Sequence, residues 1–342
     1  MQKNTWGLRM AAGLLTCLGL GGLGPASAAD AVTVQLDWVV RANHAMFFVG
    51  KEQGYFSKQG IDLTTVRKGT GTTDALRLVA NGNATFGFGD LPTLMVGRTQ
   101  GLNNTAIVAV NQKSPLAMIS VKARKPLSKP SDLKGMNVGV HPSGSTYVFL
   151  KAFFAKNGLS LDDVKQSTVA PPYENYLVLG RVDAVPGYID AEVPELESKT
   201  GGPGSLSILQ GSDFGLPSFG SGLFVSDKTI AEKPDLVQRF VKAYLQSFQY
   251  VIENPKAAVD IVVKANPEYL GKEEMLMKQL DADIHHTFFS AETKQHGIGA
   301  IDPDQWAKTG KMFQEQGALA ATADPTKGFD NRFVAEAKPL QR

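Results

Sequence analysis

Cysteine is almost absent from this chain, whose 342 residues include only Cys17. A single thiol excludes an internal disulfide framework and a metal site built from several thiolates. The chain also has no H-E-x-x-H metal pattern and no G-x-S-x-G nucleophile turn. We therefore expect no catalytic residues, no bound metal and no cofactor.

Excess charge of either sign is lacking too, because 35 Lys and Arg residues face 33 Asp and Glu residues. Two of the cations, Lys3 and Arg9, belong to an N-terminal leader, so the rest of the chain balances 33 against 33 (35 − 2 = 33). A neutral protein lacks the positive electrostatic field that attracts nucleic acids and anionic membranes. We expect no nucleic-acid partner.

Outside the leader, no apolar run reaches the roughly eighteen residues needed to cross a bilayer. The leader has a positive start, an apolar run over 10–23 and an Ala-Ser-Ala triplet at 26–28, which is typical of a secretory signal. We expect residues 1–28 to be removed and the protein to reach the periplasm. Cys17 follows a threonine and a very short apolar run, which disfavours a lipid anchor there.

The chain after the leader has more residues than one ordinary hydrophobic core accommodates, which favours two lobes. Strands alternate with helices over most of the chain, and strands at 116–121 and 223–225 are the expected crossings between the lobes. The sequence thus predicts an α/β protein whose lobe one comprises 30–119 and 224–342 and whose lobe two comprises 120–223.

The stretch from Val32 onward predicts a strand, a polar turn and a helix in quick succession, since apolar and polar residues alternate up to Trp38. Asn43 suits the N-cap of a helix that starts near His44. In open α/β sheets ligands lie beyond the carboxyl ends of strands, where helices begin. Asp37, Trp38, Asn43 and His44 are therefore candidate ligand contacts, while a core tryptophan, a plain cap and a structural histidine remain the alternatives.

Two later strand-to-helix turns and one loop add polar candidates. Asp90 opens a helix after a short strand, as a cap or a ligand contact. The turn after the strand at 137–140 nearly spells a P-loop, but a serine replaces its lysine, which argues against an NTPase. A hydroxyl-rich helix N-terminus remains, able to hold a polar group or only to cap. The candidates from these segments are Asp90, Ser143, Gly144, Ser145, Thr146 and Tyr173.

Several of these segments resemble one family. LDW at 36–38, NH at 43–44, KEQGYF at 51–56 and GIDL at 60–63 are similar to the opening of the periplasmic solute-binding proteins of ABC importers for thiamine pyrimidine precursors, and more broadly of nitrate, sulfonate and taurine binders. The resemblance implies a two-lobed periplasmic binding protein of type II, with two crossing strands.

The same resemblance implies three further contacts. Related binders carry a polar segment ending in Ser-Pro, which matches Ser114 here, and a G-x-V-D-A-V-x-G-Y-like run followed by an acidic residue and proline, which matches 180–194. Tyr188 and Glu192 carry over by that match. Asp190-Ala191 and the extra Val193 depart from it and weaken the assignment of Glu192.

The leading hypothesis is a monomeric binding protein that closes around a small planar heterocycle and delivers it to an ABC permease, with its ATPase, at the inner membrane. An oxyanion ligand such as an alkanesulfonate, taurine or nitrate is the alternative, with Arg41 and Lys113 as the nearest cations. The resemblance extends to fungal pyrimidine-synthesising proteins of the same fold. Those rely on a cysteine-rich motif that the mature chain lacks, so we expect no enzyme.

Overall fold

The computed structural model describes residues 1–2, 28–170, 172 and 174–341. Most of the expected secretory signal, with Cys17, and the candidate contact Tyr173 lie outside the described residues. Within the described part of the chain, no helix combines the length and apolar character needed to cross a membrane.

Two five-stranded sheets form the centre of the protein, with strand orders β2-β1-β3-β10-β4 and β7-β6-β8-β5-β9. Each sheet has three parallel strands followed by one antiparallel strand, β10 or β5, that lies between two others. The two sheets thus repeat one topology. The strands are β1 Asp30–Gln35, β2 Ile61–Arg67, β3 Phe86–Asp90, β4 Asn104–Ala109, β5 Leu116–Val121, β6 Asn137–Val140, β7 Lys165–Thr168, β8 Ala184–Tyr188, β9 Leu206–Gln210 and β10 Ser221–Ser226.

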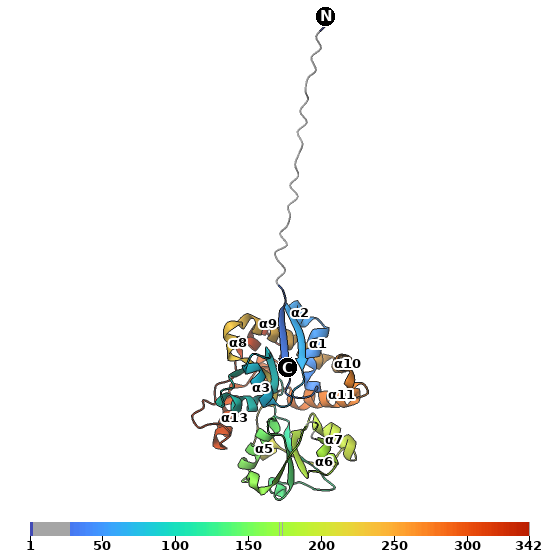
Figure 1. Cartoon of the computed structure of the whole chain (residues 1–342), viewed down its shortest axis with the longest axis vertical. Helices are drawn as coiled ribbons and strands as arrows, with labels where there is room; N and C mark the ends of the chain where they lie inside the picture. The colour runs from blue at the N-terminus through green and yellow to red at the C-terminus, as the bar shows by residue number, and fades with distance from the viewer. Residues whose placement is uncertain (3–27, 171, 173, 342) are drawn as a thin grey trace.

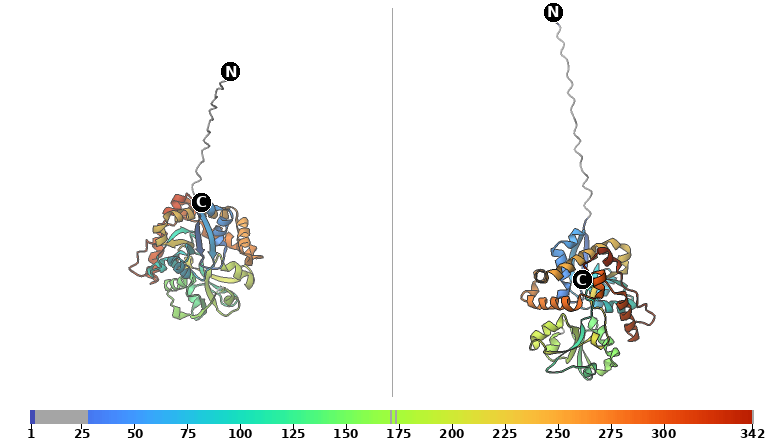
Figure 2. Two further views of the ribbon diagram at one scale, coloured as in Figure 1. Left: turned by 45° about the horizontal axis from the view of Figure 1, so that its top comes forward. Right: turned by 180° about the vertical axis from the view of Figure 1, so that it is seen from behind.

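The chain changes sheets twice, because β5 pairs only within the second sheet and β10 only within the first. The expected lobe limits at 119/120 and 223/224 fall inside β5 and β10, so as domain limits they stay a prediction. We call the first sheet with helices α1–α4 and α8–α14 lobe one, and the second sheet with α5–α7 lobe two. Figures 1 and 2 show lobe two below lobe one in all three views.

Helices cover both sheets, which confirms the α/β class. The helix expected from His44 begins at Ala45, because a 3-10 turn at Ala42–His44 precedes it and contains Asn43, which therefore does not cap it. The helices are α1 Ala45–Glu52, α2 Tyr55–Lys58, α3 Thr72–Ala80, α4 Leu91–Thr99, α5 Ser145–Lys156, α6 Glu174–Val178, α7 Glu192–Thr200, α8 Asp227–Glu232, α9 Pro234–Glu253, α10 Pro255–Ala265, α11 Glu273–Ala282, a π-helical turn η6 Asp283–Thr287, α12 Ala291–His296, α13 Pro303–Glu315 and α14 Arg332–Ala337.

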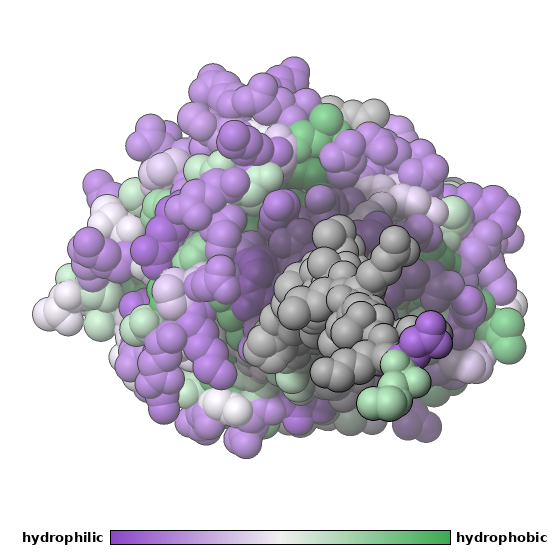
Figure 3. Space-filling model, turned by 90° about the horizontal axis from the view of Figure 1, so that it is seen from above, coloured by the Kyte–Doolittle hydropathy of each residue, from purple (hydrophilic) through white to green (hydrophobic). Residues whose placement is uncertain are grey.

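Aromatic packing holds the long helix α9 against the first sheet. Phe240 of α9 stacks on Phe86 of β3, with ring centroids 3.8 Å apart and an interplanar angle of 8°, and on Phe56 at 5.0 Å. All three side chains are buried in one apolar cluster. Hydrophilic side chains dominate the described surface seen from above (Figure 3).

We expect Phe240→Ala to lower the free energy of unfolding by about 3 to 5 kcal/mol, because it removes a buried ring and leaves a cavity between two others. Urea denaturation followed by far-UV circular dichroism measures the loss. Leu270→Ala, at a side chain that is 70% exposed, is the matched control and should change stability little. Equal effects of the two substitutions would contradict this account of the core.

Candidate ligand-binding site

A cavity of about 20 Å³ lies between the lobes, beyond the carboxyl ends of β1, β6 and β8. A space of this size holds about one water molecule. The location is the one expected for a ligand in an open α/β fold. The lining residues are Asp37, Trp38, Arg41, Gly71 and Thr72 from lobe one and His141, Gly144, Ser145, Thr146 and Tyr188 from lobe two.

Arg41 fills the space between two aromatic rings from opposite lobes. Its guanidinium carbon lies over both rings, 5.8 Å from the centroid of Trp38 and 5.2 Å from that of Tyr188. The same guanidinium forms a buried ion pair with Glu192 at the start of α7. A planar cation from lobe one is therefore held by two ring faces and by a carboxylate of lobe two.

Glu192 is the carboxylate that joins the lobes at this point. Its Oε2 accepts a hydrogen bond of 2.5 Å from the backbone N–H of Tyr188. Burial raises the pKa of Glu192 and the nearby carboxyls of Glu174 and Asp190 add to the rise, whereas the charge of Arg41 is the largest influence that lowers it. The charge on Glu192 thus depends on the pairing with Arg41.

His44 supports the site from behind and does not line the cavity. The backbone N–H of Arg41 donates to its Nδ1 at 3.0 Å, which leaves Nε2–H to donate to Asp37 Oδ1 at 3.3 Å. Burial lowers the pKa of His44, so the ring is neutral. Its two hydrogen bonds fix the position of the Asp37 carboxylate, which does line the cavity.

Two loops from opposite lobes close one side of the cavity. The His141 Nε2–H donates to the carbonyl oxygen of Thr70 at 2.5 Å, and the backbone N–H of Thr73 donates to the carbonyl oxygen of Ser143 at 3.3 Å. Gly71 lies between these contacts with φ +148, and a Cβ there would meet Ser143 O at 2.5 Å. Only glycine allows this close approach of the two backbones.

The N-terminus of α5 contributes hydroxyl groups from lobe two. Ser145 Oγ and Tyr188 Oη share a hydrogen bond of 2.6 Å. Burial raises the pKa of Tyr188 well above its usual range, so its phenol keeps its proton, and either hydroxyl can be the donor in this hydrogen bond. Thr146 and the N-terminal Thr72 of α3 add two hydroxyls from opposite lobes.

Asp90 is a helix cap, the more favoured of its two alternatives. Its Oδ1 accepts from the Thr93 backbone N–H at 2.8 Å and from the Thr93 hydroxyl at 2.6 Å, while its buried Oδ2 has no hydrogen-bond partner among the described residues. Burial raises the pKa of Asp90 to about 7, against the two bonds from Thr93, and the charge of Asp37 adds to the rise.

Other expected contacts lie away from the cavity lining. Asn43 is buried within the 3-10 turn. Ser114 lies in a connecting segment, where its N–H donates to Ser218 O at 2.7 Å, and both line a different cavity of about 450 Å³. Ser143 meets Thr70 and Thr73 across the closing loops. None of these three residues is among those that line the cavity, although the Ser143 hydroxyl lies 3.1 Å from Nε2 of His141, which does line it.

Sequence reasoning expected the glycine- and threonine-rich turn at 68–73 at the same sheet edge as Trp38, but did not name Gly71 or Thr72 as contacts. It also did not name His141, and it considered Arg41 only for an anionic ligand. All four follow the carboxyl end of a strand. That position was the available signal. For Arg41 the turn after β1 gave no indication that its side chain would reach Glu192.

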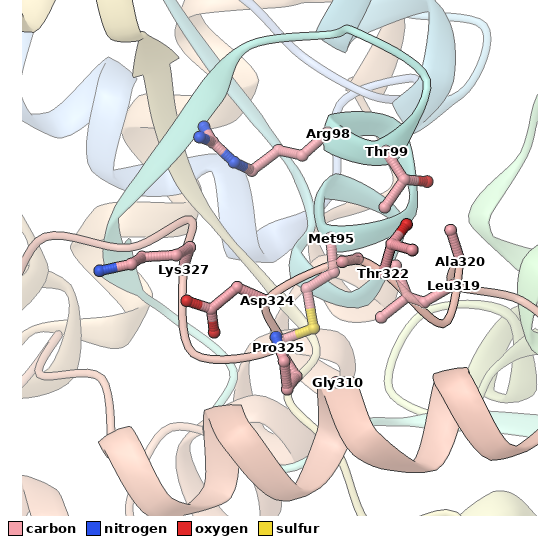
Figure 4. Close-up of a pocket in the computed structure, with 11 residues that line it drawn as sticks. Met95, Arg98, Thr99, Gly310, Leu319, Ala320, Thr322, Asp324, Pro325 and Lys327 are labelled. Carbon is pink, nitrogen blue, oxygen red and sulfur yellow. The ribbon is translucent and has the colours of Figure 1, made fainter.

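A larger cavity of about 350 Å³ lies within lobe one, between α4, α13 and the loop at 319–327 (Figure 4). Arg98, which lines it, donates to Asp227 Oδ1 at 2.9 Å, and Asp324 accepts from Thr326. Its lining comes from lobe one alone. Lobe motion therefore cannot enclose a ligand there, unlike at the cavity around Trp38.

The family model described as NMT1/THI5 like matches residues 41–258. The chain belongs to this family. Two relatives are named as binding proteins: the riboflavin-binding protein RibY of Chloroflexus aurantiacus, 26% identical over 89% of this chain and 86% of that protein, and the formylaminopyrimidine-binding protein of Halalkalibacterium halodurans, 28% identical over 82% and 83%. A third, 22% identical over 89% and 92%, is named 4-amino-5-hydroxymethyl-2-methylpyrimidine phosphate synthase, from Legionella pneumophila.

Solved structures share the fold. The ligand-binding component of an ABC-type import system from Staphylococcus aureus superposes with a TM-score of 0.66 at 13% identity, covering 90% of this chain and 99% of that one. The periplasmic nitrate-binding protein NrtA from Synechocystis also has a TM-score of 0.66, at 13% identity, covering 90% and 88%. The periplasmic-binding-protein fold and the family resemblance expected from the sequence are confirmed.

Replacing Glu192 by glutamine should open the ligand-free protein, because Arg41 then loses its buried counter-charge and regains water when the lobes separate. Loss of one partner of a buried ion pair costs on the order of 2 to 5 kcal/mol. Small-angle X-ray scattering should show a larger radius of gyration. Glu195→Gln, on the same helix and paired with Lys199, is the control. A Glu192→Gln protein as compact as the wild type would sink this prediction.

Replacing Asp90 by asparagine should stabilise the protein above neutral pH, since asparagine still caps α4 but carries no charge. A folded-state pKa of about 7 against 3.8 means that wild-type stability from this group is full below about pH 4 and is lost as pH rises through about 7, at a cost on the order of 4 kcal/mol. Urea unfolding at several pH values measures it. An unchanged pH dependence in Asp90→Asn would show that this burial costs nothing.

Proposed function

We propose that the protein is the solute-binding component of an ABC importer, which captures a small planar organic ligand, pyrimidine-like or another heterocycle, by hinge closure and delivers it to a membrane permease. One observation carries the proposal. A planar group with N–H donors, the Arg41 guanidinium, already lies over the rings of Trp38 and Tyr188 and pairs with Glu192. A flat heterocycle with exocyclic amines fits the same surroundings.

Binding requires the lobes to open, because the cavity of about 20 Å³ has no room for a ring. When they open, the guanidinium leaves the space between the two aromatic walls. A ligand entering there would stack on Trp38, donate to Glu192 or Asp37, and accept from Ser145. Closure about the two connecting segments would then bury it, as in hinge-bending binding proteins.

The relatives support a binding role, since two of them are named for binding riboflavin and formylaminopyrimidine, both flat nitrogen heterocycles. A relative named as a synthase makes enzyme activity the competing hypothesis. Against it, the mature chain has no cysteine and, among the described residues, no grouping of three His, Cys, Asp or Glu side chains suited to a metal ion. We propose that the protein acts without catalysis, as a monomer in the periplasm after removal of its signal.

An oxyanion ligand is the second candidate, and it rests on a different feature of the same cavity. The N-termini of α3 and α5 both reach the cavity, with the hydroxyls of Thr72, Ser145 and Thr146, and Arg41 supplies a cation. Helix N-termini and hydroxyl donors hold carboxylates and sulfonates. The pairing of Arg41 with Glu192 neutralises that cation in the closed protein, which is why we favour the planar heterocycle.

A thermal-shift screen of the mature protein distinguishes the two candidates, because a ligand that binds only the native state raises the unfolding temperature. The screen should include pyrimidines, flavins, alkanesulfonates, taurine and nitrate. We expect shifts with flat heterocycles. Shifts confined to sulfonates, taurine or nitrate would contradict the heterocycle proposal and support an oxyanion ligand.

Trp38→Ala should weaken binding of the ligand found in that screen at least tenfold, or about 1.4 kcal/mol, since it removes a stacking surface. Isothermal titration calorimetry measures the affinity, and Trp38→Phe, which keeps a ring, is the matched control. Ligand-induced changes in tryptophan emission should also come chiefly from Trp38, because Trp306 is buried in lobe one. Unchanged affinity in a folded Trp38→Ala protein would place this side chain in the scaffold.

A further inference from the structure

A second cavity lies beside the two segments that connect the lobes, which span 110–115 and 211–220. Its volume of about 450 Å³ falls within the range of about 300 to 1,000 Å³ that is typical of small-molecule sites. It shares no lining residue with the cavity around Trp38. The connecting segments line it with Lys113, Ser114, Ser212, Pro217 and Ser218.

Both lobes contribute walls to this hinge-side cavity. Ile189, directly after β8, and Gln210, at the end of β9, belong to lobe two. His286 of η6 and Lys308 of α13 belong to lobe one. A molecule held between these walls touches both lobes, so it binds best to the arrangement of the lobes seen here.

Backbone hydrogen bonds fix the buried part of the lining. The N–H of Ser114 donates to Ser218 O at 2.7 Å, which ties the two connecting segments together. The N–H of Gln112 donates to Thr287 O at 2.6 Å, which ties the first segment to lobe one. Ser114, Ser218 and Thr287 are all buried. The cavity is thus bounded by fixed backbone and not only by mobile surface side chains.

The Ser114 hydroxyl has an unused donor at this cavity. Ser114 is only 8% exposed, and its Oγ accepts from the Leu116 N–H at 3.4 Å. The hydroxyl hydrogen has no acceptor among the residues that the structure describes. A buried donor without an acceptor is unfavourable, so an acceptor inside the cavity would improve this environment.

The charge of the lining favours an anion. Three basic residues line the cavity, Lys113, His286 and Lys308, against one acidic residue, Asp302, among the described residues. Asp302 is already engaged, because its Oδ1 caps α13 by accepting from the N–H groups of Asp304 and Gln305 at 2.8 and 3.2 Å. Neither lysine forms an ion pair within the described part of the chain. The two ammonium groups are therefore available to a negatively charged ligand.

We infer that this cavity is a second ligand site, which takes a small carboxylate with a compact apolar body between the two lobes. The carboxylate pairs with the lysines and accepts from Ser114, as charge-assisted hydrogen bonds favour. Ile189 and Pro217 supply apolar surface for the body of the ligand. The inference goes beyond the proposed function and does not depend on it.

Isothermal titration calorimetry of the mature protein with cyclohexanecarboxylate tests the site. The ring of this probe is not flat, so it does not suit stacking on Trp38. We expect saturable binding, and binding at least about tenfold weaker for cyclohexanecarboxamide, which has nearly the same shape but no charge. Absence of saturable binding, or equal binding of the amide, would overturn the inference.

Two lysine variants locate the probe. Lys113→Gln and Lys308→Gln should each weaken its binding about fivefold or more, since each removes one charge from the lining. Lys311→Gln, on the same helix as Lys308, is the matched control, because Lys311 is exposed and does not line the cavity. If neither lining variant weakens binding more than the control does, the probe binds elsewhere and the site is wrong.

Two further variants test the contact with lobe two. Ile189→Ala and Gln210→Ala should each weaken binding of the probe about threefold or more, because each shortens a side chain of that wall. Far-UV circular dichroism checks that both variants fold. Unchanged affinity in both would overturn the contact with both lobes. No measurement here uses a ligand of the cavity around Trp38, so these outcomes are independent of the thermal-shift screen.

Discussion

The ligand-binding site of this protein is organised around one buried ion pair, in which Arg41 of lobe one meets Glu192 of lobe two. An isolated charge in this environment would cost several kcal/mol, so each partner makes the burial of the other tolerable. The rings of Trp38 and Tyr188 both lie within 6 Å of the guanidinium carbon, so the ion pair and the two aromatic walls meet at one point between the lobes. Opening gives both charges back to water, which keeps the closed state reversible, as a binding protein requires.

The parts of the site that sequence reasoning located are those set by local pattern. Alternating apolar residues predicted the strand that leads to Asp37 and Trp38, and glycine and hydroxyl residues after a strand predicted the helix N-terminus at Ser145 and Thr146. All four line the cavity. Strand ends converge on one edge of an α/β sheet whatever the rest of the chain does, so a local pattern was enough to place them.

The remainder was set by tertiary contacts that no local pattern contains. Arg41 and Glu192 lie 151 positions apart in sequence, and their pairing depends on how the two lobes close. The turn that contains Ser114 was recognised, but its side chain lies at a second cavity beside Ser218. Asn43 and His44 were placed correctly near the strand end, yet packing turned His44 toward Asp37 and made it a support. Side-chain direction was the missing quantity in each case.

The position of Arg41 also constrains what the cleft selects. Ligand and guanidinium cannot both lie between Trp38 and Tyr188, because the closed cavity has room for about one water molecule. The measured affinity of any ligand is therefore the difference between its own contacts and those that Arg41 gives up. A ligand that only stacks replaces the ring contacts but leaves Glu192 with the Tyr188 N–H as a donor and without a counter-charge, and a buried carboxylate without its charge partner is costly. A ligand that both stacks and donates to Glu192 replaces both, so the internal cation raises the discrimination in favour of flat rings with amino groups.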